Sequence, residues 1–471
     1  MDEGVLLEFE GLNVNRGSRN VLCDIDFQLK KGEVVALVGD NGSGKTTFIE
    51  SCTGIVPFKK GVLLFHTRDD SRTVIRNSEG RKSNLPTIGL TLQNDGICGE
   101  ETVEERLLTS LHMQTREVSN LQITNLLSDW GLDHRKSDRN SQLSGGLRRR
   151  LSVLSGLSPA IISSEPIVIL LDEPSEGLDE NARKLLINWV RTLASKNHGI
   201  IIASHDKELI SCADRIIKIQ ENGTITESNG SALGDFAKLP EFSNDIEPIS
   251  MMSLVRWSTK MEFRNPIDTV GRLTPALIAL LLTYSLTNNT NFNTLSNDIL
   301  APLILLPGFI TCIIAPALIN RFNEAECGKW WHVMLGVKLR PISSFLGASI
   351  LLPLPLTYLS WFVLVGDNSG NHSDEVMKWL WLPALSLIDV AIAASALHFL
   401  VADLHRSNAA SGSLLLIVLV WPFLELSNSL SVIMSSGMSF SLEMGSPLIS
   451  CIIASLSSSI IWLVVIFLPD A

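Results

Sequence analysis

The 471-residue sequence contains no C-x-x-C pair, no internal repeat and no long basic run. Its seven cysteines are scattered, which argues against a metal cluster, and those in the first half suit a reducing cytosol. The net charge of −11, with no basic run longer than Arg148–Arg150, argues against a nucleic-acid partner. The start of the chain has no signal sequence, so we expect its first half to stay in the cytoplasm.

The apolar share of 45% averages over two different halves. The first half is mixed, whereas the second half is very apolar. Between them, residues 221–249 are rich in Gly, Ser, Asn and acidic residues and lack helical periodicity. Composition therefore predicts an α/β domain at 1–228, a linker at 229–250 and a transmembrane domain at 251–471.

The segment Gly39–Thr47, GDNGSGKTT, fits the pattern G-x-x-x-x-G-K-[ST] and follows the apolar run Val34–Val38. In such a loop, backbone N–H groups point at phosphates, Lys45 can reach the β and γ oxygens, and the Thr46 hydroxyl suits Mg²⁺. The pattern predicts a nucleotide site. Its residues are Gly39, Asn41, Gly42, Gly44, Lys45, Thr46 and Thr47.

Two carboxylates follow a run of apolar β-forming residues, Ile167–Leu170, which predicts a buried parallel strand. Asp172 and Glu173 then lie at its carboxyl end, where open α/β sheets bind ligands. Phosphoryl transfer requires mainly positioning and charge neutralisation, which such groups supply. Gln93 and His205 taken alone are ordinary polar residues, but their order behind the phosphate loop favours a functional role.

Three further segments carry a family resemblance: Leu143–Leu157 (LSGGLRRRLSVLSGL), Ile167–Asp179 (IVILLDEPSEGLD) and Ile201–Asp206 (IIASHD). Together with the phosphate loop, their order resembles the ATP-binding subunits of ABC transporters over residues 5 to about 222. The resemblance implies an α/β P-loop NTPase fold that hydrolyses ATP with Mg²⁺.

The resemblance also implies roles for single residues. Asp172 would help to hold Mg²⁺, together with Thr46 and Gln93, and Gln93 would sense the γ-phosphate. Glu173 would polarise the attacking water, and His205 would clamp the γ-phosphate. The residues that would close over the nucleotide bound to a second copy of the chain are Ser144, Gly145, Gly146 and Asp179.

Two positions depart from the usual pattern of that family. Leu147 replaces a glutamine after the LSGG signature, which leaves the phosphate-contacting residues in place. Arg16 stands where an aromatic side chain usually stacks on adenine. Its guanidinium plane can also stack, so Arg16 is a candidate nucleotide-binding residue, with a plain solvated charge as the alternative.

The second half contains six apolar stretches: 272–287, 299–319, 342–365, 379–402, 411–434 and 447–468. Most reach the length of about 20 residues that crosses a bilayer, so they predict a domain of six transmembrane helices. The connections assigned to the cytoplasm hold most of the basic residues, namely Arg321, Lys329, Lys338, Arg340 and Arg406. The positive-inside rule then predicts a multi-pass protein of the cell membrane with both termini in the cytoplasm.

The cytoplasmic loop Arg321–Pro341 and the connection of the fourth to the fifth span look like the membrane subunit of cytochrome c maturation haem exporters. Arg16 is similar to that branch too. The resemblance implies a fusion of the two exporter subunits, with haem-handling cytochrome c maturation proteins as partners. Trp330 and Trp331 are explained more simply by the aromatic belt of the membrane interface. His372, His398 and His405 are read as ordinary histidines.

Asp389 and Glu425 lie in the middle of predicted spans, where a charged acid costs about 2.5–3.5 kcal/mol. Each is expected to face protein or water. A translocation path or protonation switch is one interpretation, and a hydrogen bond between helices is the other.

The sequence predicts a half-transporter that acts as a homodimer, because each ATP site would need the signature of a second copy. Export, including haem export, is the first hypothesis. ATP-driven remodelling of a haem-chaperone partner without transport is the second, and general export of a lipid, glycan or drug is the third. Because Glu324 and Glu326 lie in the longest cytoplasmic loop, we expect them to dock on a basic groove and transmit ATP-driven closure.

Overall fold

The protein is described by a computed structural model that covers residues 4–66, 71–112, 118–240, 251–288, 296–336, 339–348, 351–365, 373–403 and 417–467. It forms two compact units. The α/β unit comprises Met1–Trp257 and Phe322–Val337, and the helical unit comprises Ser258–Arg321 and Lys338–Ala471. The composition-based boundaries at 228 and 250 remain predictions, but the contacts assign Phe322–Val337, from the second half of the sequence, to the first unit.

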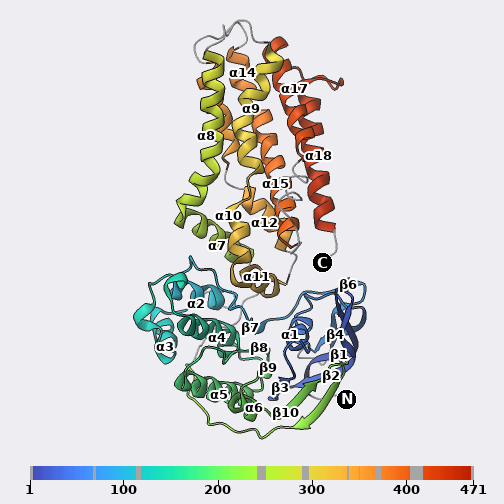
Figure 1. Cartoon of the computed structure of the whole chain (residues 1–471), viewed down its shortest axis with the longest axis vertical. Coiled ribbons are helices and arrows are strands. Elements are labelled where there is room, and N and C mark those ends of the chain that lie inside the picture. Colours follow the sequence, from blue (N-terminus) through green and yellow to red (C-terminus); the bar gives the residue numbers. More distant parts are fainter. Residues whose placement is uncertain are drawn as a thin grey trace. The chain divides into compact units, whose positions relative to one another are not determined.

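Two β-sheets build the α/β unit (Figure 1). The antiparallel sheet has the order β2-β1-β4-β5-β6, and the second sheet has the order β11-β10-β3-β9-β8-β7. In the second sheet, β10, β3, β9, β8 and β7 are parallel, and β11 pairs antiparallel at the edge. The strands are β1 (Val5–Arg16), β2 (Arg19–Lys30), β3 (Val34–Val38), β4 (Lys60–His66), β5 (Arg72–Asn77), β6 (Gly80–Arg81), β7 (Ile88–Thr91), β8 (Val168–Asp172), β9 (Gly199–Ala203), β10 (Arg215–Ile219) and β11 (Ile225–Asn229).

The parallel sheet positions the predicted nucleotide site. The predicted strands at Val34–Val38 and around Ile167–Leu170 are confirmed as β3 and β8, and every residue of β8 is buried. Because β3, β9, β8 and β7 are adjacent and parallel, the segments that follow them lie at one edge of the sheet. These segments carry the phosphate loop, His205, Asp172 with Glu173, and Gln93.

Helices cover this sheet and bury its apolar side chains in a core that includes Trp130 and Trp189, whose rings meet edge to face at 5.5 Å. The α4 helix packs on β7 and β8. The helices up to residue 240 are α1 (Lys45–Cys52), α2 (Val103–His112), α3 (Asn120–Asp129), α4 (Gly145–Ile162), α5 (Glu180–Ser195) and α6 (Lys207–Ser211).

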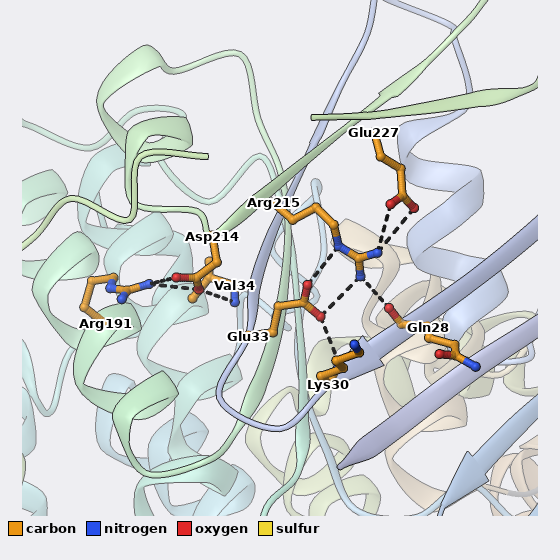
Figure 2. A network of polar contacts seen from close by, with 8 residues as sticks. All are labelled: Gln28, Lys30, Glu33, Val34, Arg191, Asp214, Arg215 and Glu227. Carbon is orange, nitrogen blue, oxygen red and sulfur yellow. Dashed lines mark hydrogen bonds and ion pairs between the residues drawn. The ribbon is translucent and has the colours of Figure 1, made fainter. Parts of the chain in front are cut away.

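A polar network ties the two sheets together (Figure 2). The Arg215 guanidinium on β10 pairs with Glu33 at 2.8 Å and with Glu227 on β11 at 3.2 Å, and it donates to the Gln28 carbonyl of β2 at 2.5 Å. The neighbouring Asp214 accepts from the Val34 N–H at 2.8 Å. Both anchors hold the start of β3, and therefore the strand that leads into the phosphate loop.

The remaining helices follow residue 250, and the longest of them run side by side in the helical unit (Figure 1). They bury a Leu- and Ala-rich core. Their bounds are α7 (Met251–Arg264), α8 (Pro266–Asn288), α9 (Asn297–Ile313), α10 (Ala317–Asn323), α11 (Cys327–Leu335), α12 (Leu339–Ala348), α13 (Pro353–Leu364), α14 (Ser373–Trp379), α15 (Trp381–Asp403), α17 (Val420–Ser436) and α18 (Pro447–Phe467).

Five helical stretches in the described residues are long and apolar enough to cross a membrane: Pro266–Thr287, Asn297–Leu335, Leu339–Leu364, Val376–Ala402 and Pro447–Phe467. The sixth predicted span, 411–434, begins at residues outside the described part, and its described portion belongs to α17. The α/β fold followed by a helical region with several candidate spans is therefore confirmed, and the count of six stays a prediction.

Candidate nucleotide site

The phosphate loop connects β3 to α1 through backbone conformations that favour glycine. Gly42 has φ 77° and Gly44 has φ 114°, in the left-handed region that side chains disfavour. A Cβ on Gly44 would lie 2.7 Å from Val21 Cγ1. The loop therefore lies tightly against the chain before it and leads into α1, whose first N–H groups have no partner within the helix and can bind phosphate.

Three predicted site residues meet beside this loop. Lys45 Nζ donates to the carbonyls of Gly39 at 2.9 Å and Asp40 at 3.3 Å, and it lies 2.9 Å from His205 Nε2. The same imidazole nitrogen lies 3.6 Å from Glu173 Oε1. In the contact with Lys45 the ammonium group donates, because it has no lone pair with which to accept. An ammonium, an imidazole and a carboxylate thus converge where a γ-phosphate is expected.

Asp172 offers the oxygen that a magnesium ion requires. Its carboxyl group is buried, Oδ1 has no hydrogen-bond partner in the described part of the chain, and the Thr46 hydroxyl bonds to the same carboxyl group. Burial raises the pKa of Asp172 to about 6, and the Thr46 hydrogen bond opposes that rise. A buried carboxylate oxygen and a hydroxyl are hard ligands, so these two residues fit Mg²⁺.

The third predicted magnesium ligand, Gln93, lies two residues beyond β7 and is exposed. The backbone carbonyl oxygen of Gln93 accepts from Arg149 Nη1 at 3.2 Å. The structure thus connects Gln93 to the carboxylate pair through an arginine, and its role at the metal stays a prediction.

Arg149 is the residue of this site that the sequence interpretation missed. It belongs to α4, and in the sequence it stands out only as part of the basic run Arg148–Arg150. Its guanidinium is buried and contacts five acceptors: the carbonyls of Leu92, Gln93, Asp172 and Glu173, and the Asp95 carboxylate. Arg149 therefore joins the segment after β7 to the carboxyl end of β8. The sequence around Arg149 shows only a basic residue in a helical segment, which is too common to indicate a site.

Glu173 has an unusual backbone with φ 45°. A non-glycine residue in this region is strained and persists only where its surroundings hold it. Here the Glu173 N–H donates to the Ala203 carbonyl at 2.9 Å, and its own carbonyl accepts from Arg149 at 2.7 Å. The strain turns the chain sharply after Asp172, so that both carboxyl groups serve one site.

The signature residues form a second group. The Ser144 hydroxyl accepts from the Leu147 N–H, so Ser144 is the N-cap of α4, and both Ser144 and Gly145 are exposed. The Arg150 guanidinium holds Asp179 at 2.6 Å. No hydrogen bond or ion pair within the described residues joins Ser144 or Asp179 to the phosphate loop of the same chain.

The segment 322–336 lies within the α/β unit and is fixed there by tryptophans. Trp330 and Trp331 are 1% and 0% exposed. The Arg106 guanidinium lies 3.7 Å from the Trp330 ring centroid, and Trp331 packs against Trp257 at 5.4 Å. The interpretation of Trp330 and Trp331 as a membrane-interface belt is therefore wrong, because both rings are buried inside a protein unit.

The acidic residues of the same segment make contacts that the structure describes in part, and their docking on a basic groove stays a prediction. Glu324 Oε2 accepts from Cys98 Sγ at 3.7 Å, and Glu326 pairs with Lys329 of the next turn at 3.3 Å. Two arginines also contact the segment: Arg81 donates to the Gly336 carbonyl at 2.8 Å, and Arg106 faces the Trp330 ring. Docking of the segment thus depends on buried aromatic contacts as well as on charge.

His398 Nε2–H donates to the Ile313 carbonyl at 2.9 Å, where α9 ends. This contact gives it a packing role in the helical unit. His372 and His405, together with Lys338 and Arg406, lie outside the described residues.

Comparisons with known proteins identify the family of the first unit. Residues 22–176 match the ABC transporter family. The chain is 31% identical over 235 residues to the Nod factor export ATP-binding protein I of Rhizobium leguminosarum, covering 49% of this chain and 71% of that protein. It is 30% identical over 234 residues to the sulfate/thiosulfate import ATP-binding protein of Nitrosomonas europaea, covering 47% of this chain and 61% of that protein.

Among solved structures, the dimeric structure of a bacterial ABC transporter cassette is 19% identical with a TM-score of 0.40, and the match covers 49% of this chain and all of that chain. The fold and the converging site define a P-loop nucleotide-hydrolysing domain. The chain belongs to the ABC transporter family, and its first unit is an ABC ATPase that binds ATP and uses Mg²⁺.

Proposed function

We propose that this protein is a half-transporter of the cell membrane that works as a homodimer and couples ATP hydrolysis to export. One observation carries the proposal: a single chain joins one ABC ATPase site to a unit with five helical stretches of membrane-spanning length. The termini would lie in the cytoplasm with the α/β unit. The relatives named above act in import and in export, so the direction rests on the fused design of this chain.

Each residue of the site has one task in the proposed mechanism. Lys45 and the loop N–H groups orient the phosphates, and Thr46, Asp172 and Gln93 would hold Mg²⁺, which neutralises charge on the β and γ oxygens. Glu173 takes a proton from the attacking water. His205, which contacts both Lys45 and Glu173, clamps the γ-phosphate.

The homodimer follows from the separation of the site into two groups. Ser144 and Gly145 are exposed, although an ATP site needs their N–H and hydroxyl groups on the γ-phosphate. We infer that Ser144, Gly145, Gly146 and Asp179 complete the site of a second copy.

ATP retention through gel filtration tests this model in the full-length protein. The Glu173→Gln protein should retain bound ATP, and adding Ser144→Arg should release it. Ser137→Arg, at another exposed serine before α4, is the matched control and should leave retention intact. Equal retention in the Ser144→Arg protein would remove the composite site.

The segment 320–341 would transmit closure, because its 322–336 part folds with the ATPase while the chain continues on both sides into the helical unit. Reversing Glu324 and Glu326 to Lys should leave the phosphate loop able to bind ATP and uncouple substrate from hydrolysis. Unchanged substrate-stimulated hydrolysis in the doubly reversed protein would exclude these carboxylates from coupling.

Asp389 and Glu425 favour a path through the helical unit. Both are half-buried, and neither makes a hydrogen bond or ion pair in the part of the chain that the structure describes. A carboxylate facing lipid is costly, so each would face water or the second copy. Among the described residues, no contact of Asp389 or Glu425 supports the alternative of a fixed hydrogen bond between helices.

Haem export with cytochrome c maturation partners is the finer proposal, and it rests on the loop resemblance and Arg16. A strain that lacks the gene should keep b-type haem proteins and lose covalently attached haem, and the Glu173→Gln version should not restore it. Normal covalent haem in that strain would favour general lipid, glycan or drug export. Restored covalent haem without ATP-dependent flux into vesicles would favour remodelling of a haem-chaperone partner.

A further inference from the structure

Glu50 connects the P-loop helix to two segments that are distant in sequence. This α1 carboxylate is only 5% exposed. Its Oε2 pairs with Arg16 at the end of β1, and its Oε1 pairs with Lys329 on α11. One buried carboxylate is therefore shared by two cations, five residues after the phosphate-binding Lys45.

The two cations differ in freedom. The Arg16 side chain is 50% exposed, whereas that of Lys329 is 25% exposed and also pairs with Glu326. Arg16 precedes the turn between β1 and β2, and Val21 in the same hairpin lies against Gly44 of the phosphate loop. Arg16 can therefore turn toward a nucleotide base or phosphate, while Lys329 is held by its helix.

Lys329 is close enough to the catalytic edge to act on its charges. Its ammonium pairs with Glu50 on α1, the helix that begins at Lys45. The helix that carries it is fixed by Trp330 and Trp331, so it cannot move away without disturbing buried rings.

We propose that Glu50 is a positioning residue through which docking of the 322–336 segment controls the availability of Arg16 to nucleotide. When Lys329 neutralises Glu50, the carboxylate holds Arg16 less strongly, and Arg16 is free to bind nucleotide. When nucleotide takes Arg16, Glu50 is left to Lys329 alone, and the segment docks more firmly. Docking of the segment and binding of nucleotide therefore strengthen each other by the same coupling free energy.

The proposal predicts whether each substitution raises or lowers the affinity for nucleotide. Lys329→Met leaves Glu50 with Arg16 alone, so the affinity for nucleotide should fall. We expect a loss of about fivefold, the lower end of ordinary allosteric coupling. Glu50→Gln releases Arg16, so the affinity should rise, a gain that misfolding cannot produce.

The test is a set of affinities for Mg²⁺·ADP, measured by calorimetry on the full-length protein in detergent, because ADP avoids hydrolysis and closure. Lys329→Met should weaken binding in the wild-type background and have no effect in the Glu50→Gln or Arg16→Met background. Lys329→Arg keeps the charge and should bind normally. Lys184→Met, at an exposed lysine paired with Glu180, controls for net charge and should be silent.

Reciprocity gives a second measurement. Mg²⁺·ADP should slow amide hydrogen exchange across 322–336 in the wild type and not in the Glu50→Gln protein. Additive effects of Arg16→Met and Lys329→Met on affinity, or equal slowing of exchange without Glu50, would overturn the proposal.

The inference rests on nucleotide binding at the phosphate loop, and its failure is distinguishable from failure of the transporter proposal. Lys45→Ala should abolish ADP binding in the same assay. If Lys45→Ala does so while the Glu50 variants are silent, the link through Glu50 is wrong and the composite ATP site is untouched.

Discussion

Arg149 of the α/β unit and the carboxylates Asp389 and Glu425 of the helical unit make very different contacts. In the α/β unit, Arg149 is buried and contacts five acceptors from two loops. In the helical unit, Asp389 and Glu425 are half-buried and have no hydrogen-bond or ion-pair partner among the described residues. Arg149 thus fixes a geometry within one chain, whereas Asp389 and Glu425 point to something outside the chain.

The two units also differ in what a second copy would add. In the ATPase, an exposed serine and glycine at the start of α4 are free to contact a ligand that another chain holds. On α17, the half-buried Glu425 and the exposed Asn428 lie one turn apart on a helix that buries much of its apolar surface. Both observations are explained if the functional protein is a dimer, and the predictions below separate the two units.

The largest effect is expected at Glu173. Glu173→Gln should reduce hydrolysis about 10³-fold, because a positioned general base contributes on this scale. Steady-state phosphate release and ATP affinity, measured together, check this. Affinity should persist, since Lys45 and Thr46 are unchanged. Glu176→Gln, at an exposed position in the same turn, should hydrolyse normally; turnover of the Glu173→Gln protein within a few-fold of wild type would reject the role of Glu173.

The next effect concerns Arg149. Arg149→Met should cost about 3 kcal/mol of unfolding free energy, because it leaves buried carbonyls and the Asp95 carboxylate without their donor. Denaturant unfolding of the α/β unit within the full chain measures it. Arg148→Met, which removes one long contact of 3.4 Å to the Leu143 carbonyl, is the control and should cost far less. Similar losses in the two variants would mean that Arg149 does not hold the two loops together.

A third effect is a pH dependence of magnesium binding. Since the pKa of Asp172 is raised from 3.8 to about 6, the carboxyl group holds a proton below that pH, which the metal must displace. Mg²⁺ affinity should therefore fall as pH drops through 6, by about tenfold per pH unit at the limit of one displaced proton. Mn²⁺ titration by electron spin resonance between pH 5 and 8 measures the profile. Asp172→Asn should bind weakly without this slope, and a wild-type profile that is flat to pH 5 would contradict the assignment.

The smallest effect should come from Glu425, and it tests the contrast between the units directly. If Glu425 faces water or a second copy, Glu425→Gln should change stability by less than about 0.5 kcal/mol, as at ordinary surface sites. If it faced lipid, removing the charge would stabilise the fold by about 2.5–3.5 kcal/mol. Leu424→Glu, at the exposed neighbouring position, serves as the reference for a charge in lipid, and unfolding in a bilayer-mimetic detergent is the measurement.

Much of the fold and part of the site followed from local pattern. The phosphate loop was predictable because its glycines meet a backbone requirement within nine residues, and β8 was predictable because a buried parallel strand is continuously apolar. The membrane-length helices followed from hydropathy alone.

The sequence by itself determined which chemistry this protein carries, because phosphate binding, the carboxylate pair and membrane-length helices each depend on contiguous residues. The tertiary structure decided how those parts are connected. Arg149 joins Leu92 to Glu173, Glu50 joins Arg16 to Lys329, and Trp330 lies on Arg106 instead of in a membrane interface. The residues of these pairs are tens to hundreds of positions apart in the sequence. Tertiary packing decides which side chains meet across such a separation, and local propensity does not encode it.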